Sequence, residues 1–368
     1  MNNIIKKILR PFYYKYLTIK KNIQLHADTV RLCQISGEHS PKVFYFGITE
    51  HSNMGDMAQC YCIRSWITEN FNGIKVYEFA ASTVVDDRFG FLDKLEKCLI
   101  PEDIIVFQSG YTTQDLGGVH ELMHRIVIDR FPNARIIMMP QTIFFKSQER
   151  RKLTSISYNQ AKNMLFLARD RVSYGMALEM FPNIMVRQFP DIVTSLIGTY
   201  SFSNPRSGIL FCCRNDSEKL YSDDEITALR SRLELLQKTE YTDTTISVDF
   251  KIIQKDIKHY LELEIGRYAH YKLIITDRYH GTIFSLIANT PVIVIKTNDH
   301  KVTTGVEWFD GVYDGYVYLA DSLDDVYLLA EQVLKRGFKY SLKPYFKKEY
   351  YDNLQDLAYR FWRGKNLV

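Results

Sequence analysis

A short polar segment, DRYHG, separates two apolar runs near residue 280. The pattern predicts a strand over 273–277 and a helix that begins near Gly281, so Arg278 and His280 lie at a strand-to-helix junction. A helix N-terminus has unpaired N–H groups and partial positive charge, which favour phosphate or carboxylate. Arg278 can bind two oxyanion oxygens through its planar fork, and His280 can donate or relay a proton near neutral pH. The segment therefore predicts an anion-binding site, and the alternative is a polar turn in which Asp277 pairs with Arg278.

A second arginine follows the first strand predicted for the C-terminal half. Arg214 belongs to the run GILFCCR (208–214), and Asp216 comes two residues later. Parallel strands present their carboxyl ends at one edge of a sheet, so we expect Arg214 to reach the face that holds Arg278. Two arginines suit one multiply charged anion. The alternative is a turn held by Asn215 and Asp216, because both residue types favour turns.

Polar residues also follow predicted strands in the N-terminal half. Asn53 and Gly55 suit a tight loop before a helix, and Asp56 falls in the first helical turn. An aspartate there complements the helix dipole, but it could also hydrogen-bond or deprotonate a sugar hydroxyl. Gln141 and Asp191 come just after two further predicted strands and are expected on the edge of the same cleft.

The segment HELMH, His120 to His124, matches the H-E-x-x-H zinc signature. No third histidine follows in the extended pattern, and the segment lies inside an ordinary strand–helix unit. Glu121 and Arg125 also have the i,i+4 spacing of a plain ion pair. We therefore predict a structural role for this segment and no metal site.

The sequence contains neither a P-loop lysine motif nor a complete G-x-G-x-x-G, so nothing in it points to ATP or NAD.

Strands and helices must bring these residues together. Over 368 residues, short apolar runs alternate with longer helical patterns. This βαβ order predicts an α/β fold with two Rossmann-like domains, parallel sheets and a cleft at the carboxyl ends of the strands. The stretch 197–207, with Gly, Ser, Asn and Pro, is the expected linker. The predicted segments are a basic leader helix (1–40), an N-terminal domain (41–196), a C-terminal domain (207–335) and a C-terminal helix that packs back across both (336–368).

The net charge of +4 is unevenly distributed, because residues 1–27 contain six Lys or Arg and no acid. This leader could contact an anionic membrane surface peripherally, or it could be a basic helix packed on the domain; Pro11 is expected to interrupt it.

The six cysteines form no CxxC pair and are predicted to be buried, reduced thiols of a cytoplasmic protein. No apolar run approaches the ~20 residues of a membrane span, no signal-peptide pattern follows the first lysines, and nucleic-acid binding is not indicated.

Taken in order, several segments make the chain resemble the polysaccharide pyruvyl transferase family over roughly residues 43–310. They are NMGDMA, FPNARIIMMPQT, ARDRVSY, FPDI, CRND, TDRYHGTIFSLIANTPVIVI and DHKVTTGVEWF. The resemblance implies a GT-B-like fold with an acceptor side in 41–196 and a donor side in 207–335. It also implies transfer of an enolpyruvyl unit from phosphoenolpyruvate to a sugar of a cell-surface or exopolysaccharide, or of its lipid-linked precursor. The products are phosphate and a cyclic pyruvate ketal, and no metal or cofactor is required.

The Arg-x-His signature of the family falls on Arg278 and His280. We expect His280 to be the general acid and Asp56 to orient or deprotonate the acceptor, so these two and Arg278 are the expected catalytic residues. The chain departs from the family pattern at Tyr279, where leucine is common, and at Asn289, where glycine is common. The remaining expected site residues bind the donor (Arg214, Asp216, Gly281, Thr282, His300 and Lys301) or the acceptor (Asn53, Gly55, Gln141 and Asp191).

Two other functions fit the same pattern of residues. A GT-B glycosyltransferase that uses a nucleotide sugar would need a similar cleft, because the basic cluster suits a diphosphate. A non-catalytic protein of polysaccharide assembly, held to a membrane by the basic leader, would need no turnover.

Overall fold

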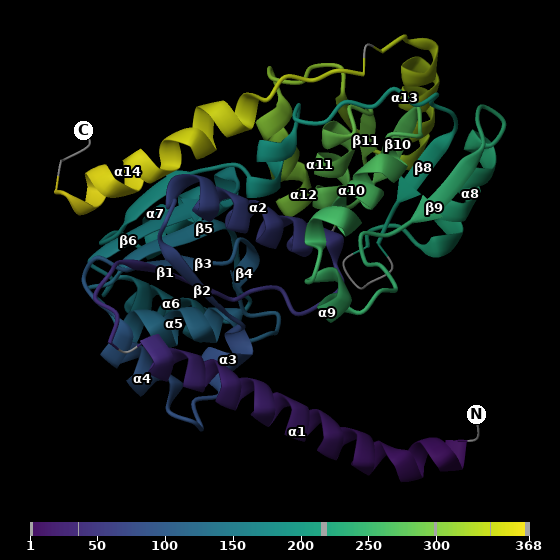
Figure 1. The fold of residues 1–368 in the computed structure, drawn as a ribbon. Helices are drawn as coiled ribbons and strands as arrows, with labels where there is room; N and C mark the ends of the chain where they lie inside the picture. The colour runs from purple at the N-terminus through teal and green to yellow at the C-terminus, as the bar shows by residue number, and fades with distance from the viewer. Residues whose placement is uncertain (1–2, 36, 215–218, 298–299, 339, 365–368) are drawn as a thin grey trace.

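The computed structural model describes residues 3–35, 37–214, 219–297, 300–338 and 340–364. Within these ranges, the side chains of some residues near the N-terminus and of Lys301 are not described. Two parallel sheets, one from each half of the chain, form the framework of the molecule (Figure 1).

The first sheet has the strand order β2-β1-β3-β5-β6-β7, and β4 pairs with the C-terminal part of β5. The pairings are parallel, and strands such as β1, β3 and β5 are almost entirely buried because helices cover both faces. Its strands are β1 (Lys42–Phe46), β2 (Lys75–Phe79), β3 (Ile104–Phe107), β4 (Gly110–Gln114), β5 (Arg135–Phe144), β6 (Asn163–Ala168) and β7 (Met185–Gln188).

The second sheet has the order β12-β11-β10-β8-β9 and is also parallel. Its central strands β8 and β10 are buried along their whole length. Its strands are β8 (Ile209–Cys212), β9 (Thr239–Thr242), β10 (Leu273–Thr276), β11 (Val292–Val294) and β12 (Val317–Leu319). The two parallel sheets confirm the predicted α/β class.

Helices connect the strands and cover the sheets (Figure 1). The first half contains α1 (Asn3–Ile35), α2 (Met54–Asn70), α3 (Ala81–Val85), α4 (Phe91–Cys98), α5 (His120–Arg130), α6 (Gln148–Tyr158), α7 (Arg171–Met180) and η1 (Ile192–Leu196). The second half contains α8 (Asp223–Leu233), α9 (Phe250–Ile253), α10 (Ile257–Tyr268), α11 (Tyr279–Ile287), α12 (His300–Val306), η2 (Glu307–Phe309) and α13 (Leu323–Lys335). The chain then continues through η3 (Lys347–Tyr351) and α14 (Asp352–Trp362).

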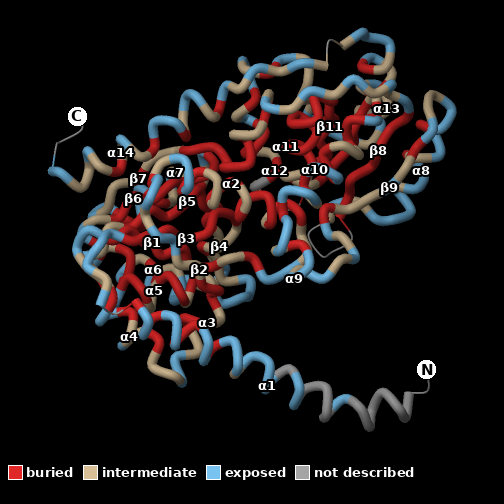
Figure 2. The backbone as a smooth tube through the Cα atoms, viewed as in Figure 1, coloured by how far each residue is buried: buried red, intermediate tan, exposed pale blue. Residues whose placement is uncertain are grey.

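The two halves share a hydrophobic core and a backbone contact. Buried residues of α2, such as Met57, belong to the same apolar cluster as Ile265 of α10 and Phe284 of α11. An antiparallel bridge also pairs Asn53 with Thr245. Figure 2 shows that buried residues run continuously from one sheet to the other. The halves are therefore joined by apolar packing as well as by the chain.

The C-terminal segment returns to the first half of the molecule. The Trp66 indole in α2 donates to the Tyr351 carbonyl at 3.0 Å, and the Trp362 indole at the end of α14 donates to the Asn163 carbonyl in β6 at 2.9 Å. In Figure 1 this helix, in yellow, lies beside β6 and α7. The contacts fasten the last helix to the N-terminal half.

Three details differ from the sequence-based predictions. Helix α1 continues through Pro11 as one element, because a proline can distort a long helix without ending it. Helix α11 begins at Tyr279, two residues before the expected start. Cys33 is exposed, whereas the other five cysteines are buried, and no disulfide joins any of the six, all of which lie in the described part of the chain.

Asn289, where the family pattern commonly has glycine, has a φ of 57°. This left-handed conformation suits glycine, and asparagine is among the few other residues that adopt it readily. The Asn289 side chain also accepts from the Leu342 N–H at 2.7 Å, so it stabilises the turn before β11.

Among the described residues, no helix is both long and apolar enough to cross a membrane.

Candidate functional site

A cavity of about 240 Å³ lies where the carboxyl ends of the two sheets face each other. The first half contributes residues that follow β1 and β6 and one residue of β4, and the second half contributes residues that follow β8, β9 and β10. The lining residues are Asn53, Asp56, Tyr111, Arg169, Arg214, Thr244, Asp277, Arg278, Tyr279 and His280. Five of the residues predicted for the site thus meet around one cavity.

His280 lies at the contact between the two halves. It is the second residue of α11, its side chain is 13% exposed, and its Nε2 lies 3.4 Å from Oδ2 of Asp191. Tyr279, beside it, is buried, and its ring lies under the guanidinium of Arg169 at 5.1 Å. The ring of His280 therefore has a carboxylate on one side and the cavity on another.

Asp191 is fully buried and holds a cluster of cations and donors together. Its Oδ2 accepts from the Gln59 amide at 2.6 Å and from the Arg169 guanidinium at 3.0 Å, and its Oδ1 accepts from the Val193 N–H. Burial alone would raise the pKa of Asp191, but the charges of His280 and Arg169 and these donors keep it well below its ordinary value. Asp191 is therefore ionised. The structure places it behind His280 and not at the acceptor side of the cavity, where the sequence prediction had put it.

Gly55 approaches His280 from the opposite half. An added Cβ at Gly55 would lie 2.1 Å from Nδ1 of His280, so any side chain there would overlap the imidazole. Gly55 is in the first turn of α2, whose N-cap Asn53 accepts from the Gly55 N–H at 2.8 Å. The glycine thus allows the N-terminus of α2 to pack directly on the histidine.

Arg278 is held by an acid that the sequence reading did not identify. Its Nε and Nη2 donate to the two carboxylate oxygens of Asp243 at 2.9 and 2.8 Å. Asp243 follows β9 directly, so the pair joins the ends of two strands of the second sheet. A two-pronged contact of this kind fixes the plane of the guanidinium. The two-pronged partner of Arg278 is therefore Asp243, whereas the polar-turn alternative had named Asp277 as its partner.

Asp277 contacts Arg214, the other arginine predicted for the site. Its Oδ1 accepts from the backbone N–H of Arg214 at 2.9 Å. Burial raises the pKa of Asp277 to about 6, even though Arg214 and Arg278 both lower it. A carboxyl group in this range changes its protonation near neutral pH.

Asp56 lies on the N-terminal side of the cavity. Its Oδ2 is 3.5 Å from Nε2 of the exposed His51, and its side chain is 34% exposed. Asn53 is largely engaged, because it caps α2 and its amide donates to the Thr244 hydroxyl at 3.3 Å. Asp56 is therefore the more accessible polar group on this wall.

Gln141 is not at the cavity, which corrects the prediction. It is fully buried, donates to the carbonyls of Gln108 and Met139, and accepts from the Thr113 hydroxyl. The prediction failed because β5 does not end before Gln141. The strand passes Pro140 through a register shift and continues to Phe144.

Three of the residues predicted to bind the donor, Gly281, Thr282 and His300, do not line the cavity. A Cβ added at Gly281 would lie 2.3 Å from the Thr276 hydroxyl, so the glycine allows α11 to pack closely on β10. The Thr282 hydroxyl is buried and donates to the Arg278 carbonyl at 3.4 Å. His300 points to the first half, with Nε2 3.7 Å from Asp170, and is not among the cavity-lining residues. Asp216 and the side chain of Lys301 lie outside what the structure describes.

The HELMH segment forms the first turns of α5 and lies inside the first half. His124 is fully buried with Nδ1 2.9 Å from the Tyr158 hydroxyl, and burial lowers the pKa of His124 well below its ordinary value. Glu121 makes the predicted ion pair with Arg125 at 2.6 Å and also accepts from the Thr154 hydroxyl. The ion pair and these contacts confirm the structural interpretation of Glu121.

Sequence reasoning missed Arg169 and Asp243. Both directly follow strands, β6 and β9, so the rule that found Arg214 and Arg278 also applied to them. Arg169 is buried, and its Nε and Nη2 donate to the Thr142 hydroxyl. Arg169 therefore places a positive charge at the cavity wall.

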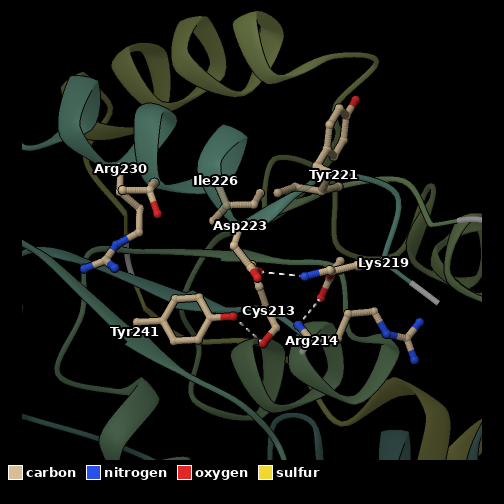
Figure 3. A pocket seen from close by; sticks show the side chains of 11 residues that line it. Cys213, Arg214, Lys219, Tyr221, Asp223, Ile226, Arg230 and Tyr241 are labelled. Carbon is tan, nitrogen blue, oxygen red and sulfur yellow. Dashed lines mark hydrogen bonds and ion pairs between the residues drawn. The ribbon is translucent and has the colours of Figure 1, made fainter. Parts of the chain in front are cut away.

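A second cavity of about 250 Å³ shares Arg214 and Asp277 with the first. Figure 3 shows residues that line this second cavity. It lies in the second half, between the end of β8 and helix α8. Figure 3 shows Lys219 and Asp223 pointing toward each other, with Nζ and Oδ1 2.8 Å apart, and the Tyr241 hydroxyl donating to the Cys213 carbonyl. The polar surface of the site therefore extends past Arg214.

Residues 53–300 match the sequence profile of the polysaccharide pyruvyl transferase family. The chain is 31% identical over 268 residues to general stress protein 30 of Bacillus subtilis, which covers 71% of this chain and 75% of the relative. It is 25% identical over 322 residues to pyruvyl transferase 1 of Schizosaccharomyces pombe, covering 81% and 77% of the two chains. The matched region contains the residues of both cavity walls.

The fold also resembles that of a UDP-GlcNAc 2-epimerase from Neisseria meningitidis. The TM-score is 0.53 at 10% identity, over 88% of this chain and all of that one. At this identity the likeness concerns the fold alone, and it agrees with a GT-B-like arrangement of two Rossmann-type sheets.

Proposed function

Because this chain belongs to the polysaccharide pyruvyl transferase family, we propose that it transfers an enolpyruvyl group from phosphoenolpyruvate to a sugar. The sugar would be part of a cell-surface or exopolysaccharide, or of its lipid-linked precursor, and the product a cyclic pyruvate ketal. The family identifies the chain as a transferase. The donor, the acceptor and the ketal are our proposal.

One observation carries the proposal more than any other. His280 lies between the ionised Asp191 and Gly55 at the wall of a cavity that Arg278 also lines. A carboxylate next to an imidazole stabilises the protonated ring and fixes its orientation. Asp191 faces Nε2 and Gly55 lies against Nδ1, so the two contacts together hold the ring at the cavity wall.

Phosphoenolpyruvate has a carboxylate and a phosphate, which require cations at two points. Arg278 and Arg214 come from adjacent strands of the second sheet, and Arg169 reaches the cavity from the first. Asp243 orients the guanidinium of Arg278, and Asp277 holds the backbone of Arg214 through its N–H. This arrangement supports a donor site on the second-half wall.

In the proposed reaction, His280 gives a proton to the methylene carbon of the donor, and positive charge develops on the neighbouring carbon. One sugar hydroxyl forms a C–O bond to that carbon and loses its proton to Asp56. A second hydroxyl then forms the other C–O bond while the bond to the phosphate oxygen breaks, and phosphate leaves with the electron pair. The proton of the second hydroxyl returns to His280, and the proton held by Asp56 passes to the released phosphate through solvent.

A thermal-shift series with phosphoenolpyruvate and with UDP tests the donor. A ligand at about 100 times its Kd stabilises a folded protein by about 2.7 kcal/mol. We expect phosphoenolpyruvate to stabilise the wild type and His280→Gln but not Arg278→Ala. Arg130→Ala is the matched control, because Arg130 does not line the cavity and forms exposed ion pairs with Asp93 and Glu96.

A shift with UDP and none with phosphoenolpyruvate would replace the proposal with glycosyl transfer. If phosphoenolpyruvate binds, phosphate release is then followed with soluble glycans and with lipid-linked sugars as acceptors. Binding of the donor with no phosphate release in either set would contradict the transfer reaction and favour a non-catalytic role.

A further inference from the structure

The described part of α1 carries a row of apolar side chains that no other part of the structure covers. Tyr16, Ile19, Ile23 and Val30 are 56%, 51%, 64% and 40% exposed, and Ala27 between them is also exposed. Their spacing of three, four and seven residues places them on one face of a helix. Large apolar side chains aligned in this way indicate a surface that binds something.

The opposite face of α1 packs on the first half. Leu25, Leu32 and Ile35 are buried, and the Thr83 hydroxyl of α3 donates to Asp28 at 2.8 Å. At 100° per residue, these side chains lie about half a turn from the exposed row. Packing of α1 on the domain therefore directs the apolar row outward. Figure 2 shows the described residues of α1 as mostly exposed where the helix leaves the domain.

The charge of the leader fits an anionic partner. Residues 1–27 contain six Lys or Arg and no acid. By helical spacing, Lys15 and Lys20 flank the apolar row on its two sides, and both are exposed. Lys21 is on the packed face, where its ammonium pairs with Asp86 at 2.7 Å.

The same spacing continues toward the N-terminus in the sequence. Positions 5, 8, 9 and 12 hold Ile, Ile, Leu and Phe. Helix α1 has 33 residues and is therefore about 50 Å long, and in Figure 1 it extends past the domain on which it packs. An apolar row flanked by lysines on a projecting helix is the arrangement of helices that lie in a membrane interface.

We propose that α1 docks the protein on an anionic lipid surface, with Tyr16, Ile19 and Ile23 among the acyl chains and Lys15 and Lys20 at the headgroups. The helix lies along the surface and does not cross it. This inference does not depend on the proposed reaction, because it concerns a surface on the opposite face of α1 from the domain.

Vesicle co-sedimentation of the full chain tests the proposal. We expect binding to vesicles that contain phosphatidylglycerol, little binding to phosphatidylcholine alone, and weaker binding as salt increases. The double variant Ile19→Ser/Ile23→Ser should weaken binding by at least about tenfold. Lys15→Gln/Lys20→Gln should weaken it by about tenfold as well, and only on anionic vesicles.

A matched control distinguishes binding by this face of α1 from nonspecific hydrophobic binding. Leu328→Ser, on α13, removes an apolar side chain of similar exposure, 56%, and should leave vesicle binding unchanged. Circular dichroism checks that each variant keeps its helices.

Two outcomes would overturn the proposal. One is equal binding of the wild type and the Ile19/Ile23 variant to anionic vesicles, or no binding by either. The other is a dimer of the wild type that disappears in this variant without any vesicle binding, because it would assign the apolar row to a second copy of the chain.

Discussion

Helices α5 and α11 both carry histidines in their first two turns, but these histidines lie in different surroundings. In α5, His124 is enclosed by the domain against Tyr158, and Glu121 contacts Arg125 and Thr154. In α11, His280 has a buried carboxylate on one side and a cavity of about 240 Å³ on another. The residue types are similar, so type alone does not distinguish a structural histidine from a functional one.

The difference lies in what surrounds the imidazole. In α5, polar contacts come from within one half of the chain, and burial favours the neutral ring. At His280, the buried carboxylate of Asp191 lies beside the ring, and a glycine of the other half leaves space for the ring. A histidine therefore becomes a candidate for acid–base chemistry where a charged partner and an open volume meet.

The largest expected effect is a difference in kcat between variants of His280 and His124. His280→Gln should lower kcat by about 10²–10⁴, because it removes the proposed general acid. His124→Gln should lower stability by about 1–3 kcal/mol through its buried contact, with no change in kcat per folded molecule. Phosphate release and urea unfolding measure the two quantities. Equal loss of kcat in both variants would contradict the distinction.

Gly55→Ala tests the contact between α2 and His280. The new Cβ would overlap Nδ1, so we expect the imidazole to shift, kcat to fall at least about tenfold, and stability to fall by about 1–3 kcal/mol. Gly175→Ala in α7 is the control, since nothing lies within 4 Å of its added Cβ. That change should be neutral or stabilise by about 0.5–1 kcal/mol. Unchanged kcat in Gly55→Ala would show that His280 is not held by this contact.

Asp277 should give stability a distinct pH dependence. Its pKa rises from 3.8 to about 6 on folding, so the folded state binds the proton more tightly, and stability falls as pH increases from about 4 to about 6. The contribution is at most about 3 kcal/mol. Asp277→Asn should remove this decline, whereas Asp324→Asn, at an exposed ion pair, should not.

Urea unfolding between pH 4 and pH 7 measures this effect. A constant difference between Asp277→Asn and wild type over that range would refute it. Asp191 has the opposite sign, because its pKa is lowered in the folded state. Its stabilising contribution is present at neutral pH and is lost as pH falls below the ordinary carboxyl range.

The smallest effect concerns the charged pair of α5. Glu121→Gln should lower stability by about 1 kcal/mol, because the ion pair is lost while the amide oxygen still accepts from Thr154. Turnover should not change. A large loss of kcat in this variant would bring the HELMH segment back as a functional candidate.

The same comparison explains how far the sequence could predict the site. Apolar runs and their alternation with helical patterns indicated both sheets, and the rule that site residues follow strands located Arg214, Arg278 and His280 at the cavity. The rule failed at Gln141 because β5 passes Pro140 and continues, which a local pattern does not reveal. Contacts such as that of Asp243 with Arg278 join segments 35 residues apart and depend on the tertiary fold.

The bridge between Asn53 and Thr245 has a consequence for ligand selection. It joins the two walls at the edge of the cavity, and the shared apolar core joins them behind it. Walls linked in this way do not need a hinge motion to assemble the site. A ligand that enters would therefore meet a cavity whose two walls are already in contact, so part of the binding geometry is preformed.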